Sequence, residues 1–229
     1  MRRIYILFAG ILLTFSLAAQ EFTIEYNIGY GAYKMEGLSN WLENSSSFIP
    51  LKKMKVTDDF PGYITHQMNL GMEWFNLHQA GISLTYMNTV WNKAVSDYSG
   101  SVDFRMRVKG VRLAPFYRFV LPDFKEKKVR PYLQLTAGFV FNNGKIEGIT
   151  ISNNVRDIES ESLDGLNFFI EPALGCKIRL HKMFALNVNA GYQFDLTKSF
   201  KFEGQKAATH PDWSGLRVQG GLIYYVSLK

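Results

Sequence analysis

The 229-residue sequence is poor in cysteine and in long apolar runs. Its single cysteine, Cys176, can form neither an internal disulfide nor a structural zinc site. A membrane-spanning helix needs about 20 consecutive apolar residues, and only the first 19 residues approach that pattern. Mean hydropathy is only -0.09, although 47% of the residues are hydrophobic. These features exclude a disulfide-stapled scaffold and a bundle of membrane helices.

Positive charge is present but is not concentrated anywhere. The formal net charge is +6 and the pI is near 9.3, yet the one Lys-rich tract is 125–128. The sequence therefore predicts no nucleic-acid partner. The four histidines and the acidic residues show no spacing typical of metal ligands. We accordingly expect no metal site and no cofactor.

The N-terminus has the three parts of a secretory signal peptide. Arg2 and Arg3 are basic, residues 4–17 are almost uninterruptedly apolar, and Ala19 offers a small residue for cleavage. We therefore expect 1–19 to be removed and 20–229 to form one domain. A membrane anchor is the weaker interpretation, because the apolar stretch is short for a span and polar sequence follows at once.

Residues 22–32 alternate between apolar side chains and polar or very small ones. Ile24 and Tyr26 share one parity, whereas Glu25 and Asn27 share the other. Successive side chains of a strand point to opposite faces, so this alternation predicts a strand with one apolar face. Seven further segments show the same pattern: 63–75, 80–91, 103–121, 129–142, 165–180, 184–197 and 215–228.

The segment 103–121 departs from strict alternation at its middle. Met106 and Val108 are apolar on one parity, and Val111 and Leu113 are apolar on the other. If the same face is apolar throughout, one extra residue must be inserted between them. We therefore predict a β-bulge at Lys109-Gly110.

The connections between these segments alternate in length. Four are long (34–62, 92–102, 143–164 and 198–214) and three are short (76–79, 122–128 and 181–183). Outer-membrane barrels have short periplasmic turns and long external loops. The sequence thus predicts an all-β fold: an eight-stranded antiparallel up-and-down transmembrane β-barrel, preceded by a cleaved signal peptide and located in the cell outer membrane.

A soluble lipocalin-like barrel is the competing architecture, with its apolar face turned inward around a ligand. The polar face of the predicted strands argues against it. That face combines charges of both signs with glycines such as Gly29, Gly71 and Gly191. Small residues and charges suit a narrow interior, whereas glycine on a water-facing strand only weakens it.

Three runs are the most characteristic of the predicted strands: VRLAPFYRF at 111–119, VRPYLQLTAGF at 129–139 and FALNVNAGYQF at 184–194. They resemble the eight-stranded outer-membrane β-barrel family of the OmpA/OmpX type and its Bacteroidetes relatives. The last strand, with Gln219, Gly221, Tyr224 and Val226, resembles the family's C-terminal assembly signal, although the chain ends in Lys229 rather than Phe. The resemblance spans about 22–229. It implies the barrel architecture and recognition by the barrel assembly machinery, but little about activity.

The polar parity predicts a charged network in the barrel lumen. Its members are Glu25, Glu73, Arg112, Arg118, Glu171, Lys177, Arg179, Asp195 and Arg217. Pairing the last two strands across their loop predicts a contact between Asp195 and Arg217. Glu25 and Glu73 should lie near each other with Arg118 or Lys177 between them, because buried charges persist only when paired. A structural polar plug is favoured over a gated conduit, since an eight-stranded barrel is just wide enough for its side chains.

The functional prediction is an integral outer-membrane protein with a structural or interaction role, in envelope integrity, adhesion or as an assembly subunit. The alternative is a narrow porin-like channel for small solutes, and a lipid-modifying enzyme is less favoured. His66 is the histidine on the lipid-facing parity, and none of its expected neighbours, Tyr30, Ala32 and Val90, is a usual nucleophile. We therefore predict no enzyme.

The predicted partners are outer-membrane lipid, the assembly machinery and an extracellular or envelope protein. Trp74 and Tyr224 should belong to the periplasmic aromatic girdle. Two outer loops, 34–62 and 143–164, are candidates for contact with a partner. The second could extend its flanking strands as a hairpin above the membrane, where an exposed edge can bind another strand.

Overall fold

The computed structural model describes residues 21–45, 55–97, 100–121, 128–152, 155–202, 205–206 and 209–227. The predicted signal peptide 1–19 and the C-terminal Leu228-Lys229 lie outside these residues. Eight long strands dominate the fold: β1 (Glu21–Gly31), β3 (Tyr63–Trp74), β4 (His78–Asp97), β5 (Gly100–Val120), β6 (Val129–Ser152), β7 (Val155–Arg179), β8 (Phe184–Phe202) and β10 (Gly215–Ser227). A helix, α2 (Glu36–Ser45), and two short strands, β2 (Lys55–Asp59) and β9 (Gln205–Lys206), accompany them.

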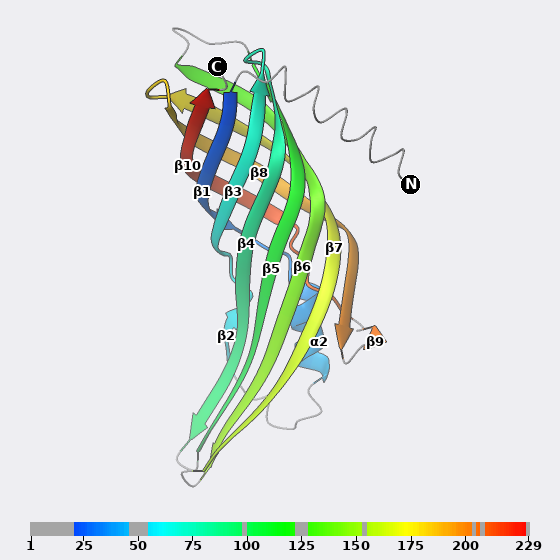
Figure 1. Cartoon of the computed structure of the whole chain (residues 1–229). Helices are drawn as coiled ribbons and strands as arrows, with labels where there is room; N and C mark the ends of the chain where they lie inside the picture. Colours follow the sequence, from blue (N-terminus) through cyan, green and yellow to red (C-terminus); the bar gives the residue numbers. More distant parts are fainter. Residues whose placement is uncertain are drawn as a thin grey trace.

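The eight long strands close into a ring (Figure 1). Each pairs antiparallel with its neighbour in the order β1-β3-β4-β5-β6-β7-β8-β10, and β10 returns to β1. The closing ladder runs without a break from Glu21 opposite Ser227 to Gly31 opposite Arg217. Closure leaves no unpaired strand edge around the ring, which is the requirement that a lipid environment imposes on a sheet.

A tight turn between β3 and β4 marks one end of the barrel. Between β3 and β4, Phe75 and Asn76 adopt positive φ values of 50° and 56°, and the Leu77 amide donates to the carbonyl of Trp74 (3.0 Å). The start of β1, the end of β10 and the β7–β8 connection lie at this same end (Figure 1). By the rule that short turns are periplasmic, this is the periplasmic end.

At the opposite end, two of the predicted loops are strands. Residues 92–102 continue β4 and β5 up to the pair Asp97–Gly100, and 143–164 continue β6 and β7 up to the pair Ser152–Val155. The four strands therefore project far beyond the closed ring (Figure 1). We call this four-stranded projection the extension: residues 88–109 of β4–β5 and 143–164 of β6–β7.

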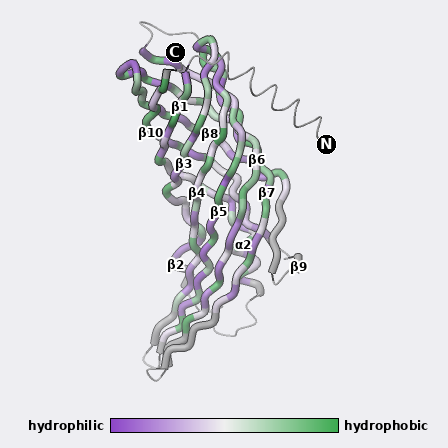
Figure 2. The backbone as a smooth tube through the Cα atoms, in the orientation of Figure 1, coloured by the Kyte–Doolittle hydropathy of each residue, from purple (hydrophilic) through white to green (hydrophobic). Residues whose placement is uncertain are grey.

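The polarity of the sheet reverses where the extension begins. Within the ring, outward side chains such as Leu84 and Leu113 are apolar and about half exposed, and inward ones are polar. In the extension, Met106 and Val108 point inward and are fully buried, whereas Arg107 and Lys109 point outward. In Figure 2, hydrophobic segments are frequent along the strands of the ring, and hydrophilic segments are more frequent along the extension.

This reversal corrects the predicted bulge. The register of β5 is continuous through Lys109 and Gly110 against both neighbours, with Lys109 opposite Asn88 and Asn143. The apolar parity changes because the surroundings of the outer face change from lipid to water, not because a residue is inserted. A bulge does occur elsewhere, between β7 and β8 at Phe168/Phe169.

Helix α2 fills the mouth of the barrel at the end from which the extension projects. Leu38 and Leu42 lie one turn apart on its inner face, and both are buried together with Met35. They belong to one buried apolar cluster, here called the cap, whose members are Met35, Leu38, Leu42, Phe60, Met87, Trp91, Met106, Val108, Ala114, Val140, Ile146, Leu163, Phe169 and Trp213. The long loop predicted at 34–62 thus contributes a plug to the barrel.

Candidate functional site

The centre of the barrel holds a hydrogen-bonded ion pair between Glu25 and Arg118. The guanidinium Nη1 lies 2.5 Å from Glu25 Oε2, and Nη2 lies 2.9 Å from Oε1. Both side chains are completely buried. Two parallel bonds of this kind give the strongest geometry available to an Arg–carboxylate pair.

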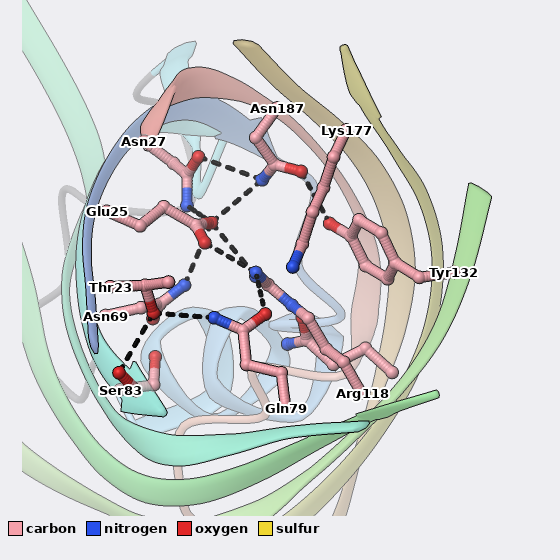
Figure 3. A network of polar contacts seen from close by, with 12 residues as sticks. Thr23, Glu25, Asn27, Asn69, Gln79, Ser83, Arg118, Tyr132, Lys177 and Asn187 are labelled. Carbon is pink, nitrogen blue, oxygen red and sulfur yellow. Dashed lines mark hydrogen bonds and ion pairs between the residues drawn. The ribbon is translucent and has the colours of Figure 1, made fainter. Parts of the chain in front are cut away.

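Amide side chains complete the hydrogen bonding of Glu25 (Figure 3). Its Oε1 accepts from Asn27 (2.6 Å), Asn69 (3.1 Å) and Asn187 (2.8 Å), which come from three different strands. Asn187 also accepts from the Tyr132 hydroxyl (2.7 Å). The buried carboxylate is therefore held from all sides of the ring.

Arg118 is fixed in the same way. Its Nε donates to Gln134 Oε1, and its guanidinium lies 4.7 Å from the centre of the Tyr132 ring. That ring occupies the space above Gly175, where a Cβ would meet the ring itself. Stacking of a guanidinium on an aromatic face adds to the ion pair.

Glu73 forms a second buried centre nearer the periplasmic end. Its two oxygens pair separately, Oε1 with Arg130 (2.8 Å) and Oε2 with Lys177 (2.9 Å). Contrary to the prediction from the sequence, the two glutamates do not share one cation: Glu25 lies opposite Asn69 and Glu73 opposite Glu21, and Arg118 pairs with Glu25 while Lys177 pairs with Glu73. Arg130 was not among the predicted residues, although its inward parity with Tyr132 and Gln134 would have identified it.

A third centre lies closer to the cap. Glu171 Oε2 is 2.9 Å from Arg112 Nη2 and 3.1 Å from Arg217 Nη2. Arg112 stacks on Phe169 at 4.1 Å, which joins this centre to the cap. Arg112 and Arg118 are six residues apart on β5, so the centres are about 20 Å apart along the strand.

The predicted contact between Asp195 and Arg217 is wrong. β10 begins at Gly215, opposite Gln193, so Arg217 lies opposite Gly191 and faces Glu171 instead. Asp195 lies beyond that ladder, where it accepts from Asn167 Nδ2 (2.9 Å), Gln193 Nε2 (2.5 Å) and the Trp213 amide (3.0 Å). It therefore anchors the final loop to the barrel mouth.

Two other groups of predicted residues lie at the periplasmic end. Arg179 is at the rim, where Nη2 pairs with Glu21 at 2.8 Å and the guanidinium stacks on Tyr225. Trp74 and Tyr224 are on outward parities near the turns, and Tyr224 contacts the ring of Phe184.

His66 lies on the lipid-facing side, as its parity predicted, but with different neighbours. It is opposite Ile28 on β1 and Tyr86 on β4, not next to Tyr30, Ala32 and Val90. Its Nδ1 is 2.9 Å from the Tyr26 hydroxyl. In the described part of the chain, no three His, Cys, Asp or Glu side chains are grouped so as to hold a metal ion. None of the described helices is long and apolar enough to cross a membrane.

The outer surface of the ring is a continuous apolar belt. Exposed large apolar side chains occur on every strand of the ring, among them Ile28, Leu70, Ile82, Leu113, Leu135, Leu174, Val188 and Val218. A surface this apolar around a buried charged interior is inverted relative to a soluble protein and suits lipid. The fold and the belt define an integral outer-membrane β-barrel protein.

Known proteins resemble the chain in fold. The outer membrane protein OprG of Pseudomonas aeruginosa is 13% identical with a TM-score of 0.48, covering 92% of this chain and 97% of that chain. Acinetobacter baumannii CarO2 is 9% identical with a TM-score of 0.41, covering 91% and 99%. Ail, the attachment invasion locus protein of Yersinia pestis, solved with the heparin analogue sucrose octasulfate, is 16% identical with a TM-score of 0.36, covering 90% and 99%. No protein-family model and no curated protein matches the sequence.

Proposed function

We propose that this protein is a non-conducting outer-membrane barrel that presents the extension to an extracellular or envelope partner. The observation that supports this most is the division of the molecule into a filled ring and a projecting sheet. Three ion-pair centres and the apolar cap occupy successive levels of the interior. Such filling disfavours the alternative of a narrow porin-like channel.

The outward face of the extension is suited to a polar partner. Arg105, Arg107 and Lys109 follow one another on this face of β5, with Lys145 on β6 opposite Arg107. A side-chain hydrogen bond from Lys145, with further attraction from Arg107, lowers the pKa of Glu147. Arg105 and Arg107 also line a groove of about 280 Å³ with Asp58 and Tyr63.

The edge of β7 offers a second mode of contact. β7 pairs with β8 only as far as Leu163 opposite Phe202, so within the described residues Val155–Ser162 pairs with β6 alone. A partner strand can add to such an edge through main-chain hydrogen bonds. Contact rather than catalysis is also the role that we propose for the chain as a whole, since the cross-strand neighbours of His66, Ile28 and Tyr86, include no serine, threonine or cysteine.

Two finer points belong to the same proposal. We place the chain with the OmpA/OmpX type and its Bacteroidetes relatives on the three sequence runs given above. We also propose that the barrel assembly machinery recognises its last strand, where Tyr224 faces outward and Gln219 faces inward.

The proposal predicts that shortening the extension weakens partner contact without harming the barrel. Lys93, Phe104, Gly148 and Glu159 lie on one rung across β4–β7. Replacing 94–103 and 149–158 each by an Asn-Gly turn cuts both hairpins at this rung and leaves the buried cap residues below it in place. We expect the shortened chain to retain the faster-migrating unboiled band of a closed barrel.

Partner contact is measured by photo-crosslinking in intact outer membranes, with the crosslinking amino acid at Arg107. We expect a protein adduct of defined mass from the full-length chain and a weaker one from the shortened chain, which retains Arg105, Arg107 and Lys109 but loses half of the β7 edge. The same group placed at Ile82 on the apolar belt is the control and should give no protein adduct. Equal adducts at Arg107 and Ile82, or no protein adduct at Arg107, would contradict an interaction role for the extension.

A further inference from the structure

A cavity lies at the periplasmic rim, away from the extension. It has a volume of about 690 Å³ and is formed by the first residue of β1, the β7–β8 connection and the end of β10. Its lining is Glu21, Lys128, Arg179, Leu180, His181, Lys182, Met183, Tyr224, Tyr225 and Val226.

The cavity extends across the rim from the lumen side to the lipid side. Arg179 and Tyr225 have inward parity, whereas Tyr224 and Val226 have outward parity and continue the apolar belt. A ligand in this cavity would therefore meet water at one end and the acyl-chain region at the other. Only an amphiphile fits both surroundings.

The charges in the cavity favour an anionic group. Glu21 is its one acidic residue and is already paired with Arg179 at 2.8 Å. Lys128 and Lys182 are exposed, and neither forms an ion pair within the described residues. Since Glu21 already pairs with Arg179, these two lysines give the opening formed by the described residues a net positive charge at the level of the inner-leaflet headgroups.

Hydrogen bonds between the segments that form the wall of the cavity hold them together. The Arg179 amide donates to the Lys128 carbonyl (2.7 Å), its Nη2 donates to the Lys182 carbonyl (3.0 Å), and the Tyr225 amide donates to Met183 (2.9 Å). These bonds link the two lysine-bearing turns to each other and to the last strand. The main chain at both lysines is thus held beside one opening.

We infer that this rim cavity binds the headgroup of an anionic phospholipid from the periplasmic leaflet. Lys128 and Lys182 contact the phosphate, and Leu180, Met183 and Val226 contact the glycerol and upper acyl chains. Basic side chains beside an apolar surface are the usual means of recognising anionic lipid.

Native mass spectrometry of the purified protein in detergent tests this inference. Phosphatidylglycerol or phosphatidylcholine is added at equal concentration, and the retained lipid adducts are compared. We expect retention of phosphatidylglycerol in preference to phosphatidylcholine. The double substitution Lys128→Gln/Lys182→Gln should lower phosphatidylglycerol retention by about 10- to 30-fold, as expected for two lysine contacts.

The matched control removes two lysines from the other end of the molecule. Lys109→Gln/Lys145→Gln makes the same change in net charge and should leave the preference for phosphatidylglycerol intact. Equal retention of the two lipids by the unmodified protein would overturn the inference, and so would a preference that survives the Lys128/Lys182 substitution. Displacement of the lipid by millimolar inorganic phosphate would assign the cavity to free phosphate instead.

Discussion

Replacing Arg118 with methionine is expected to lower the free energy of unfolding by about 3–5 kcal/mol, the usual cost of breaking a fully buried ion pair. The substitution leaves Glu25 charged and buried with only amide partners, which cannot neutralise it. The folded fraction can be followed in a urea titration as the heat-modifiable band on unboiled gels.

Two further variants separate the ion pair from general packing. In Glu25→Gln/Arg118→Met no unpaired charge remains, so most of the lost stability should return. Arg105→Met breaks a partly exposed pair with Asp103 and should cost about 0–1 kcal/mol. A loss below about 1 kcal/mol for Arg118→Met would mean that the centre of the barrel is hydrated and that its charges are not truly buried.

Substitution of Trp213 with alanine should loosen the cap while leaving the ring closed. Trp213 is completely buried, its Nε1 donates to Asn142 Oδ1 (2.6 Å), and its ring meets Tyr33 edge-on at 4.7 Å. Removal of a buried tryptophan costs about 3–5 kcal/mol. Because the contacts of Trp213 lie at the mouth of the barrel and not among its central ion pairs, we expect this loss of stability to appear as local opening of the mouth.

Protease treatment of intact cells measures that local opening. The Trp213→Ala variant should be cleaved in its outer segments much faster than the unmodified protein, whereas its heat-modifiable band should persist. Trp74→Ala, a tryptophan removed from the lipid face near the periplasmic turns, is the control and should leave cleavage of the outer segments unchanged. Loss of the band in Trp213→Ala would show that the cap is required for barrel closure.

The alternation of side chains was sufficient to predict the ring. β1, β3 and β10 begin and end within one residue of the predicted segments. This worked because lipid outside and a narrow polar lumen impose opposite demands on successive residues. The parity also placed Glu25, Glu73, Arg118 and Lys177 in the interior.

Prediction failed where the surroundings change along a strand. In the extension, water replaces lipid outside and α2 supplies an apolar partner inside, so Met106 and Val108 keep the inward parity of Arg112. The prediction from the sequence assumed that the same face of the strand is apolar along its whole length, and under that assumption these two residues required a bulge. The same assumption ended β4 and β7 at the membrane boundary, far short of Asp97 and Val155.

The partners of the buried charges were harder to predict than their positions. Asp195 and Arg217 point into the same lumen, but their contact depended on the register of β10 against β8, in which Gly215 lies opposite Gln193 and not opposite Thr197. The amides around Glu25 lie on three strands, so no local spacing identifies them. Such contacts depend on how distant strands are placed around the closed ring, and the spacing of residues along one strand does not reveal this.

The central claim of a filled barrel is tested most directly by planar-bilayer recording of the purified, heat-modifiable protein. Three ion-pair centres and the cap predict a baseline without discrete opening steps over a wide range of voltages. Regular single-channel steps from the unmodified protein would contradict this account, and they would support a narrow channel through the lumen in place of a surface-contact protein.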